Sequence, residues 1–272
     1  MVIPFLLYNH FPEREKQIKV PLHRYATIFL LSAPKEVLMK LITGLELNNE
    51  GRNLAWALDY PGCFSYGDDD QEALLRLPQA FVAYQYWVNF KAGEKSWLKD
   101  ITDFDVRLVE TFKVYAINEK YEVVEQGYDV NAWFQNDWVA LTEEEVQQGL
   151  LLMDWSRQDL LQLLEGIPTD LREKKSEGER WNILGIVNHI SNAEWWYMDR
   201  LGLTDLKRTE LPKDTFTRIE LVREQLKNVM PELIGKNLIH GKEGEFWSPR
   251  KLLRRVLWHE KDHIHHIYKL IS

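Results

Sequence analysis

The sequence predicts an α+β protein, with a small mixed α/β domain at residues 1–138 and an all-helical domain at residues 139–272. Runs of β-branched and aromatic residues separated by turn residues dominate the first half. The second half instead carries helix-capping signals, each followed by a long amphipathic stretch. A length of 272 residues is also sufficient for two domains of ordinary size.

The predicted first domain begins with a strand at residues 25–31, where β-branched and aromatic side chains are concentrated. Apolar residues at helical spacing predict a helix over residues 34–47. Residues 54–58 are predicted to form a second strand. The segment 59–62 contains Pro and Gly and is typical of a turn. Residues 63–66 are therefore expected to pair back on the second strand.

A helix is predicted next, over residues 69–89, because its acidic first turn suits the positive end of a helix dipole. Residues 104–117 alternate between apolar and polar side chains, which predicts one or two further strands. Strands and helices are thus mixed throughout this half of the chain.

Four helices are predicted in the second domain, and each begins at a residue that can cap its first turn: Thr142, Asn182, Thr217 and Ser248. Pro231 is expected to kink or stop the third helix, and Pro249 suits the first position of the fourth. Four amphipathic helices of this length predict a four-helix bundle.

Composition excludes several classes of protein. The formal net charge of −8 argues against broad, sequence-independent binding to nucleic acid. No apolar run approaches the roughly 20 residues of a membrane span, and residues 1–8 lack the basic start of a signal peptide. The single cysteine, Cys63, excludes a disulfide framework and multi-cysteine metal sites, and we expect it to be a small buried side chain. These features predict a cytoplasmic protein.

The last predicted helix has one continuous face that combines apolar residues with two histidines: Leu252, Val256, His259, His263, Ile267 and Leu270. We therefore expect His259 and His263 to point into the core. Unpaired buried polar groups cost about 1–3 kcal/mol each. A divalent metal satisfies both imidazoles at once, whereas a hydrogen-bonded cluster of core histidines is the alternative.

His189, on the inward face of the second predicted helix, is the expected third ligand. Three histidines leave one coordination position open, which is typical of a catalytic metal site. Zinc, nickel, iron and manganese all remain possible. His266 is the reserve ligand, and His265 is expected to be solvated.

Residues 259–263 also fit the H-E-x-x-H pattern of zinc proteases, in which the glutamate is a general base. We do not favour this interpretation. Only nine residues follow His263, and they contain no third ligand of the protease type. Glu260 also lies about 100° off the histidine face.

Residues 142–271 resemble DinB/YfiT-like proteins. The resemblance lies in Trp155-Ser156-Arg157-Gln158, in Trp181-Asn182 followed by His189, and in Trp258-His259-Glu260-Lys261-Asp262-His263. It implies a four-helix bundle with a metal site, often nickel or zinc, formed by His189, His259 and His263. Characterised members of this family include thiol-dependent transferases, so the resemblance implies a low-molecular-weight thiol as a candidate cofactor. It also implies a homodimer.

Residues 50–90 resemble HicB-like domains, because Trp56 to Asp68 followed by Glu72-Ala73-Leu74 is similar to their strand–turn–strand–helix core. In antitoxins that fold is joined to a DNA-binding module. No such module is recognisable in this sequence.

Three functions are consistent with these observations. The first is a metal-dependent thiol S-transferase or hydrolase that binds a small-molecule substrate in a pocket lined by Trp196 and Trp258, with His266 nearby. The second is a non-catalytic, metal-stabilised binding or stress-response protein whose N-terminal domain docks a partner. The third, nucleic-acid contact, would use the basic start of the last helix: Arg250, Lys251, Arg254 and Arg255.

Overall fold

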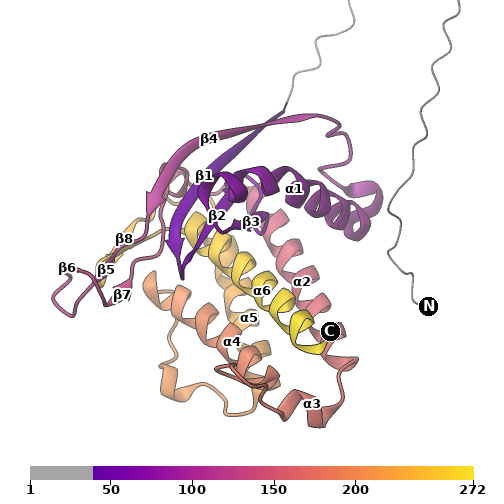
Figure 1. Ribbon diagram of the computed structural model, residues 1–272, viewed down its shortest axis with the longest axis vertical. Coiled ribbons are helices and arrows are strands. Elements are labelled where there is room, and N and C mark those ends of the chain that lie inside the picture. Colours follow the sequence, from indigo (N-terminus) through magenta and orange to yellow (C-terminus); the bar gives the residue numbers. More distant parts are fainter. Residues whose placement is uncertain (1–38) are drawn as a thin grey trace, which may run out of the picture. The chain divides into compact units, whose positions relative to one another are not determined.

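The computed structural model describes Met39–Ser272, which form one compact unit (Figure 1). The strand predicted at residues 25–31 lies outside the described residues. The N-terminal part is a four-stranded sheet in the order β3-β2-β1-β4, followed along the chain by smaller strands. Its elements are β1 (Met39–Asn49), β2 (Arg52–Ala57), β3 (Phe64–Gly67), α1 (Asp70–Ala92) and β4 (Phe104–Lys113).

The helix predicted over residues 34–47 is wrong where the structure describes it, because β1 occupies Met39–Asn49. β1 pairs antiparallel with β2 and parallel with β4, so it lies inside the sheet. A strand buried on both faces is apolar at nearly every position and loses the two-residue alternation that identifies half-buried strands. Leu41 and Ile42, two of the residues that gave the helical spacing, satisfy it by accident.

The other strands and the helix predicted within the described part of this region are confirmed. β2 and β3 form an antiparallel pair around the turn that contains Pro61 and Gly62. Asp69 caps α1 by accepting a hydrogen bond from the backbone N–H of Glu72. β4 and β5 (Ala116–Ile117) cover the segment predicted to form one or two strands.

The helical part contains α2 (Glu143–Glu165), α3 (Thr169–Glu173), α4 (Ile183–Arg200), α5 (Thr215–Val229) and α6 (Pro249–Ile271). Thr142, Asn182 and Ser248 cap α2, α4 and α6 as predicted. The predicted cap of α5 is wrong, because Asp214 accepts from the backbone N–H of Thr217 and starts the helix earlier. Pro231 lies in a 3₁₀ turn directly after α5 and ends the helix. None of the described helices is long and apolar enough to cross a membrane.

Short strands complete the structure between and beside these elements. They are β6 (Val123–Val124), β7 (Tyr128–Asp129), β8 (His240–Lys242) and β9 (Glu245–Trp247). β5 pairs with both β6 and β7, and β8 pairs with β9. These strands of two or three residues are too short to show a hydrophobic period, so the sequence did not reveal them.

Four charged side chains, one from each of α2, α4, α5 and α6, meet inside the helical region: Arg157, Glu194, Arg223 and Glu260. Arg157 Nε lies 2.6 Å from Glu260 Oε1, and Arg223 Nη2 lies 3.1 Å from Glu260 Oε2. Glu194 accepts hydrogen bonds from both arginines. We call these residues the buried charge cluster. It ties each of these helices to the others.

The basic start of α6 is buried against other parts of the chain instead of facing solvent. Arg250 binds Glu145, Arg254 binds Asp137 and Arg255 binds Glu46. Lys251 donates to the backbone carbonyls of Asn131 and Phe246. All four basic side chains are buried, so they form no surface for nucleic acid and that hypothesis loses its basis.

These contacts join the parts on either side of residue 138 into one packed unit. Trp258 of α6 packs against Trp56 of β2 at 5.5 Å between ring centroids and donates to the Tyr66 hydroxyl at 3.0 Å. The domain boundary between residues 138 and 139 stays a prediction.

Candidate metal centre

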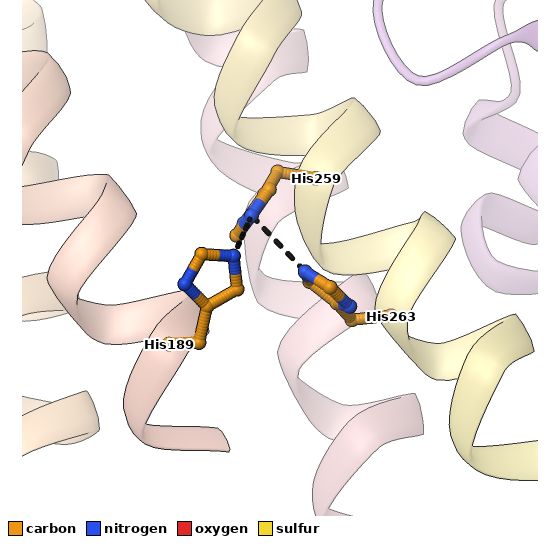
Figure 2. Close-up of side chains that lie close together, drawn as sticks. All are labelled: His189, His259 and His263. Atoms are coloured by element: carbon orange, nitrogen blue, oxygen red, sulfur yellow. Dashed lines mark hydrogen bonds between the residues drawn. The ribbon is translucent and has the colours of Figure 1, made fainter. Parts of the chain in front are cut away.

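The three predicted histidines lie together. His259 Nε2 is 3.1 Å from His189 Nε2 and 3.1 Å from His263 Nε2. Figure 2 shows the three rings pointing toward one another, His189 from α4 and the other two from α6. Ligand atoms from all three lie within 4.8 Å of one another. The sequence therefore identified the members of this cluster, which we call the histidine triad.

Local sequence explains how each ring reaches the triad. His259 and His263 are one turn apart on α6, and Val256 and Ile267 on the same face are buried as predicted. Asn182 caps α4 by accepting from the backbone N–H of Gly185, which places His189 about two turns into that helix.

Trp181 holds the third ring in place. It stacks on His189 with 4.5 Å between ring centroids and an interplanar angle of 23°. The Arg180 guanidinium carbon lies 4.4 Å from the centroid of the Trp181 ring. The sequence contained a signal for this role, because Trp181 directly precedes the residue that caps the helix of His189, but packing alone was an equally good explanation.

Burial keeps the triad uncharged at neutral pH. It lowers the pKa of His259 well below its ordinary value of 6.5 and the pKa of His263 to about 3. Burial, with a smaller effect of Arg180, also lowers the pKa of His189. Neutral imidazole is the form that binds metals, because its unprotonated nitrogen carries a free lone pair.

The distances suit a shared cation better than a hydrogen-bonded cluster. A ring nitrogen carries either one proton or one lone pair, so His259 Nε2 can make only one of its two 3.1 Å contacts as an ordinary hydrogen bond. A cation accepts all three lone pairs at once. Three nitrogens at tetrahedral angles and 2.0–2.1 Å from a metal are separated by about 3.3 Å, close to the observed spacing. The triad therefore fits a divalent metal.

The other histidines of α6 lie outside this group. His266, the predicted reserve ligand, pairs with Glu179 at 3.0 Å, and its ring centroid is 6.1 Å from that of His263. The prediction that it contributes to the site is therefore not supported by the geometry. His265 is exposed, as predicted.

Glu260 is not placed to act as the base of a zinc protease. Its side chain is fully buried in the charge cluster between Arg157 and Arg223. Both arginines offset the effect of burial and lower its pKa. It is a structural carboxylate held away from the triad.

A cavity of about 410 Å³ lies beside the triad and is lined by His189 and His259. Trp196 and Trp258, the predicted pocket residues, also line this cavity. The remaining wall comes largely from the sheet region and the loops after it, including Glu46, Asn49, Tyr128 and Asn131. Both parts of the chain are thus needed to form this cavity.

Sequence reasoning missed the contribution of the sheet region. One signal was present: Glu46 is the only charged residue in the apolar run 41–47. A lone buried carboxylate requires partners. Glu46 accepts hydrogen bonds from Trp56 Nε1 at 3.0 Å and from Arg255 Nη2 at 3.0 Å. It therefore fixes the cavity wall against α6.

Cys63 takes no part in this site. It is buried, as predicted, and burial raises the pKa of its thiol to about 12. A thiol with this pKa is inert as a nucleophile at neutral pH.

One comparison with known proteins covers the histidine triad, and the others find no match. No curated protein matches the chain, and no solved structure matches it. The resemblance of residues 50–90 to HicB-like domains is not confirmed. The family model of the DinB superfamily matches residues 152–267, a span that contains the whole histidine triad. The C-terminal half of this chain, residues 152–267, therefore belongs to the DinB superfamily.

Proposed function

We propose that His189, His259 and His263 bind a divalent metal and that the protein is a metal-dependent thiol S-transferase or hydrolase. The observation that carries this proposal is the convergence of three uncharged Nε2 atoms at the wall of a 410 Å³ cavity. Three protein ligands and an accessible remaining side are typical of catalytic metal sites, whereas structural sites are closed by a fourth ligand. Nickel, zinc, iron and manganese are the candidate ions.

When bound, such an ion is a Lewis acid that lowers the pKa of a water or thiol in its open position. The chain supplies the remaining requirements. Trp181 orients the His189 ring, and Trp196 and Trp258 offer aromatic walls for the apolar part of a substrate. The Glu46–Arg255 pair fixes the wall opposite the helices. A low-molecular-weight thiol is the proposed co-substrate.

The architecture around the site supports finer assignments that we also propose. Helices α2, α4, α5 and α6 would be the four helices of a DinB-like bundle, which the shared charge cluster supports. The order β2–turn–β3–α1 supports a HicB-like identity for the sheet region. The sheet region and the helices both line the cavity, which offers a physical reason for joining them in one chain.

A pair of chromogenic reactions tests catalysis. Glutathione with 1-chloro-2,4-dinitrobenzene tests the transferase, in which the sulfur replaces chloride and the thiol proton is released. p-Nitrophenyl acetate tests the hydrolase. We expect at least one rate to rise when protein stripped by a chelator is reloaded with zinc or nickel. The His259→Ala/His263→Ala variant should show only the uncatalysed rate.

Metal binding without any metal-dependent rate in either reaction would contradict the catalytic proposal. It would favour the non-catalytic alternative, a metal-stabilised protein whose sheet region docks a partner. One observation specifically supports that alternative. The outer face of α1 exposes four large apolar side chains. Their accessible fractions are 79% for Leu75, 54% for Val82, 74% for Tyr86 and 74% for Phe90. Contiguous exposed apolar side chains commonly mark an interaction surface.

We propose that a second copy of this chain covers this stripe on α1. The helix has acidic residues, Asp70 and Glu72, in its first turn, and the exposed basic Lys95 lies in the 3₁₀ turn that directly follows it. Two copies packed antiparallel would place each acidic end beside a basic end. Charge complementarity therefore favours a homodimer over a partner protein whose surface carries charges of only one sign.

Light scattering coupled to size exclusion tests this interface. We expect the full chain to have twice the 32.3 kDa mass of one copy. The Tyr86→Glu/Phe90→Glu variant should have the mass of one copy, because it buries charge in the apolar stripe. Glu177→Ala, an exposed position far along the chain from α1, should stay dimeric. A monomeric wild type, or a dimer that persists in the double variant, would overturn this proposal.

A further inference from the structure

A second cavity, of about 700 Å³, lies between α1, α2 and α6. Lys261, which lines it, is two residues from both His259 and His263, so its side chain leaves α6 about 160° away from each of these histidines, on the opposite side of the helix. Most of the lining is apolar or aromatic and includes Tyr84, Trp87, Leu163, Ile167 and Ile264. Residues of α6 line both cavities, but no single described residue lines both.

Among the residues that the structure describes, Lys261 carries the one ammonium group in the lining of this second cavity. Its Nζ lies 3.6 Å from the centroid of the Trp87 ring and 4.7 Å from that of Tyr84. Within Met39–Ser272 it makes no hydrogen bond or ion pair with a carboxylate. Lys261 is half-buried, and the aromatic faces attract the ammonium but replace only part of the hydration that this burial removes.

The nearest candidate counter-ion is already used. Asp159 lies on the same cavity wall, where its Oδ1 pairs with Lys91 Nζ at 2.5 Å. Its Oδ2 accepts from Trp87 Nε1 at 2.7 Å. The carboxylate therefore holds the Trp87 ring in position beneath the ammonium, while Lys261 itself keeps its hydrogen-bonding capacity for something else.

We propose that this cavity binds a small molecule with one carboxylate and an apolar body, with the carboxylate on Lys261. The chemistry of the lining supports both parts of this ligand. An apolar body would contact the aromatic and aliphatic walls, and a single anionic group would satisfy the single unpaired ammonium. A volume of about 700 Å³ lies within the ordinary range for small-molecule pockets. This site is separate from the proposed metal centre and does not depend on it.

The alternative is that Lys261 only joins α6 to α1 through its aromatic contacts. Two matched probes distinguish these roles by isothermal titration calorimetry on the full-length protein. Octanoate carries the carboxylate, and 1-octanol has an apolar body of the same length without the charge. We expect octanoate to bind wild type at least about 10-fold more tightly than octanol, the factor that one charge-assisted hydrogen bond provides.

The Lys261→Met variant keeps the apolar stem and removes the charge. We expect it to bind octanoate about 10–100-fold more weakly and octanol unchanged. Lys269→Met, which removes an exposed ammonium from the same helix, should leave both affinities unchanged. Circular dichroism melting confirms that each variant is folded.

Equal affinity of wild type and Lys261→Met for octanoate, or no octanoate binding to wild type, would overturn the proposal. Metal content measured on the same samples separates this result from the metal proposal. Octanoate binding should persist after the metal is removed by a chelator. Loss of octanoate binding on metal removal would also contradict a site that is independent of the triad.

Discussion

Replacing His259 and His263 together with alanine is expected to abolish specific metal binding. Wild type, purified without a tag, should contain about one equivalent of a divalent metal by mass spectrometry, and the double variant should contain none. The expectation rests on the 3.1 Å spacing of the Nε2 atoms and on burial, which keeps these rings uncharged. Removing two of three ligands leaves a single imidazole, which does not hold a metal through purification.

Two single variants should give graded results in the same measurement. His189→Ala removes one ligand and should reduce metal content strongly. Trp181→Ala keeps all ligands and removes only the ring stacked on His189, so we expect affinity to fall by about 10–100-fold, as for other outer-shell groups. His265→Ala alters an exposed histidine of the same helix and is the matched control. Wild type that holds no metal, even after reconstitution, would make the triad a hydrogen-bonded core cluster.

The Glu260→Ala variant is expected to lose about 3–5 kcal/mol of unfolding free energy, the usual cost of removing one partner from a buried ion pair. Glu260 is 0% exposed and binds Arg157 and Arg223. Without it, both buried guanidinium groups share the single carboxylate of Glu194. Urea unfolding followed by circular dichroism gives the free energy by linear extrapolation.

The dependence on pH provides a second measurement for this variant. The neighbouring arginines outweigh burial and lower the pKa of Glu260 below its ordinary value of 4.5. A lowered carboxyl pKa stabilises the folded state above the unfolded pKa, and this contribution is lost as the pH falls through the folded value. Wild type should therefore lose stability more steeply than Glu260→Ala below about pH 4.5.

Glu177→Ala, at an exposed position, is the control and should change stability by less than about 0.5 kcal/mol. A Glu260→Ala variant with the stability and acid response of this control would show that the buried charge cluster contributes nothing to the fold.

The sequence allowed the helices and the triad to be predicted because their signals are local. Capping residues and the spacing of His259 and His263 depend on neighbours within one or two turns, and the structure places them as expected. Where a signal depended on remote partners, the sequence misled. Arg255 belongs to a basic run that suggested a surface, yet its partner Glu46 is 209 residues away in the chain.

Dependence on remote partners also explains why the sequence did not identify strand β1 or the cavity wall that the sheet region forms. Leu41 and Ile42 fit a helical period, and only pairing with β2 and β4 identifies the segment as a central strand. The contribution of Tyr128 and Asn131 to the cavity likewise follows from how the sheet region packs on the helices. No period or capping rule within either segment reveals that packing.

The buried charge cluster has a consequence for how the proposed metal would enter and leave this protein. Small zinc-binding domains are unfolded without their ion, since the ion supplies their folding energy. Here ionic contacts between Arg157, Glu194, Arg223 and Glu260 fix the helices in a single register, and Glu260 directly follows His259. These contacts hold the three proposed ligands in place without an ion, so we expect one ion to be exchanged for another while the scaffold stays intact.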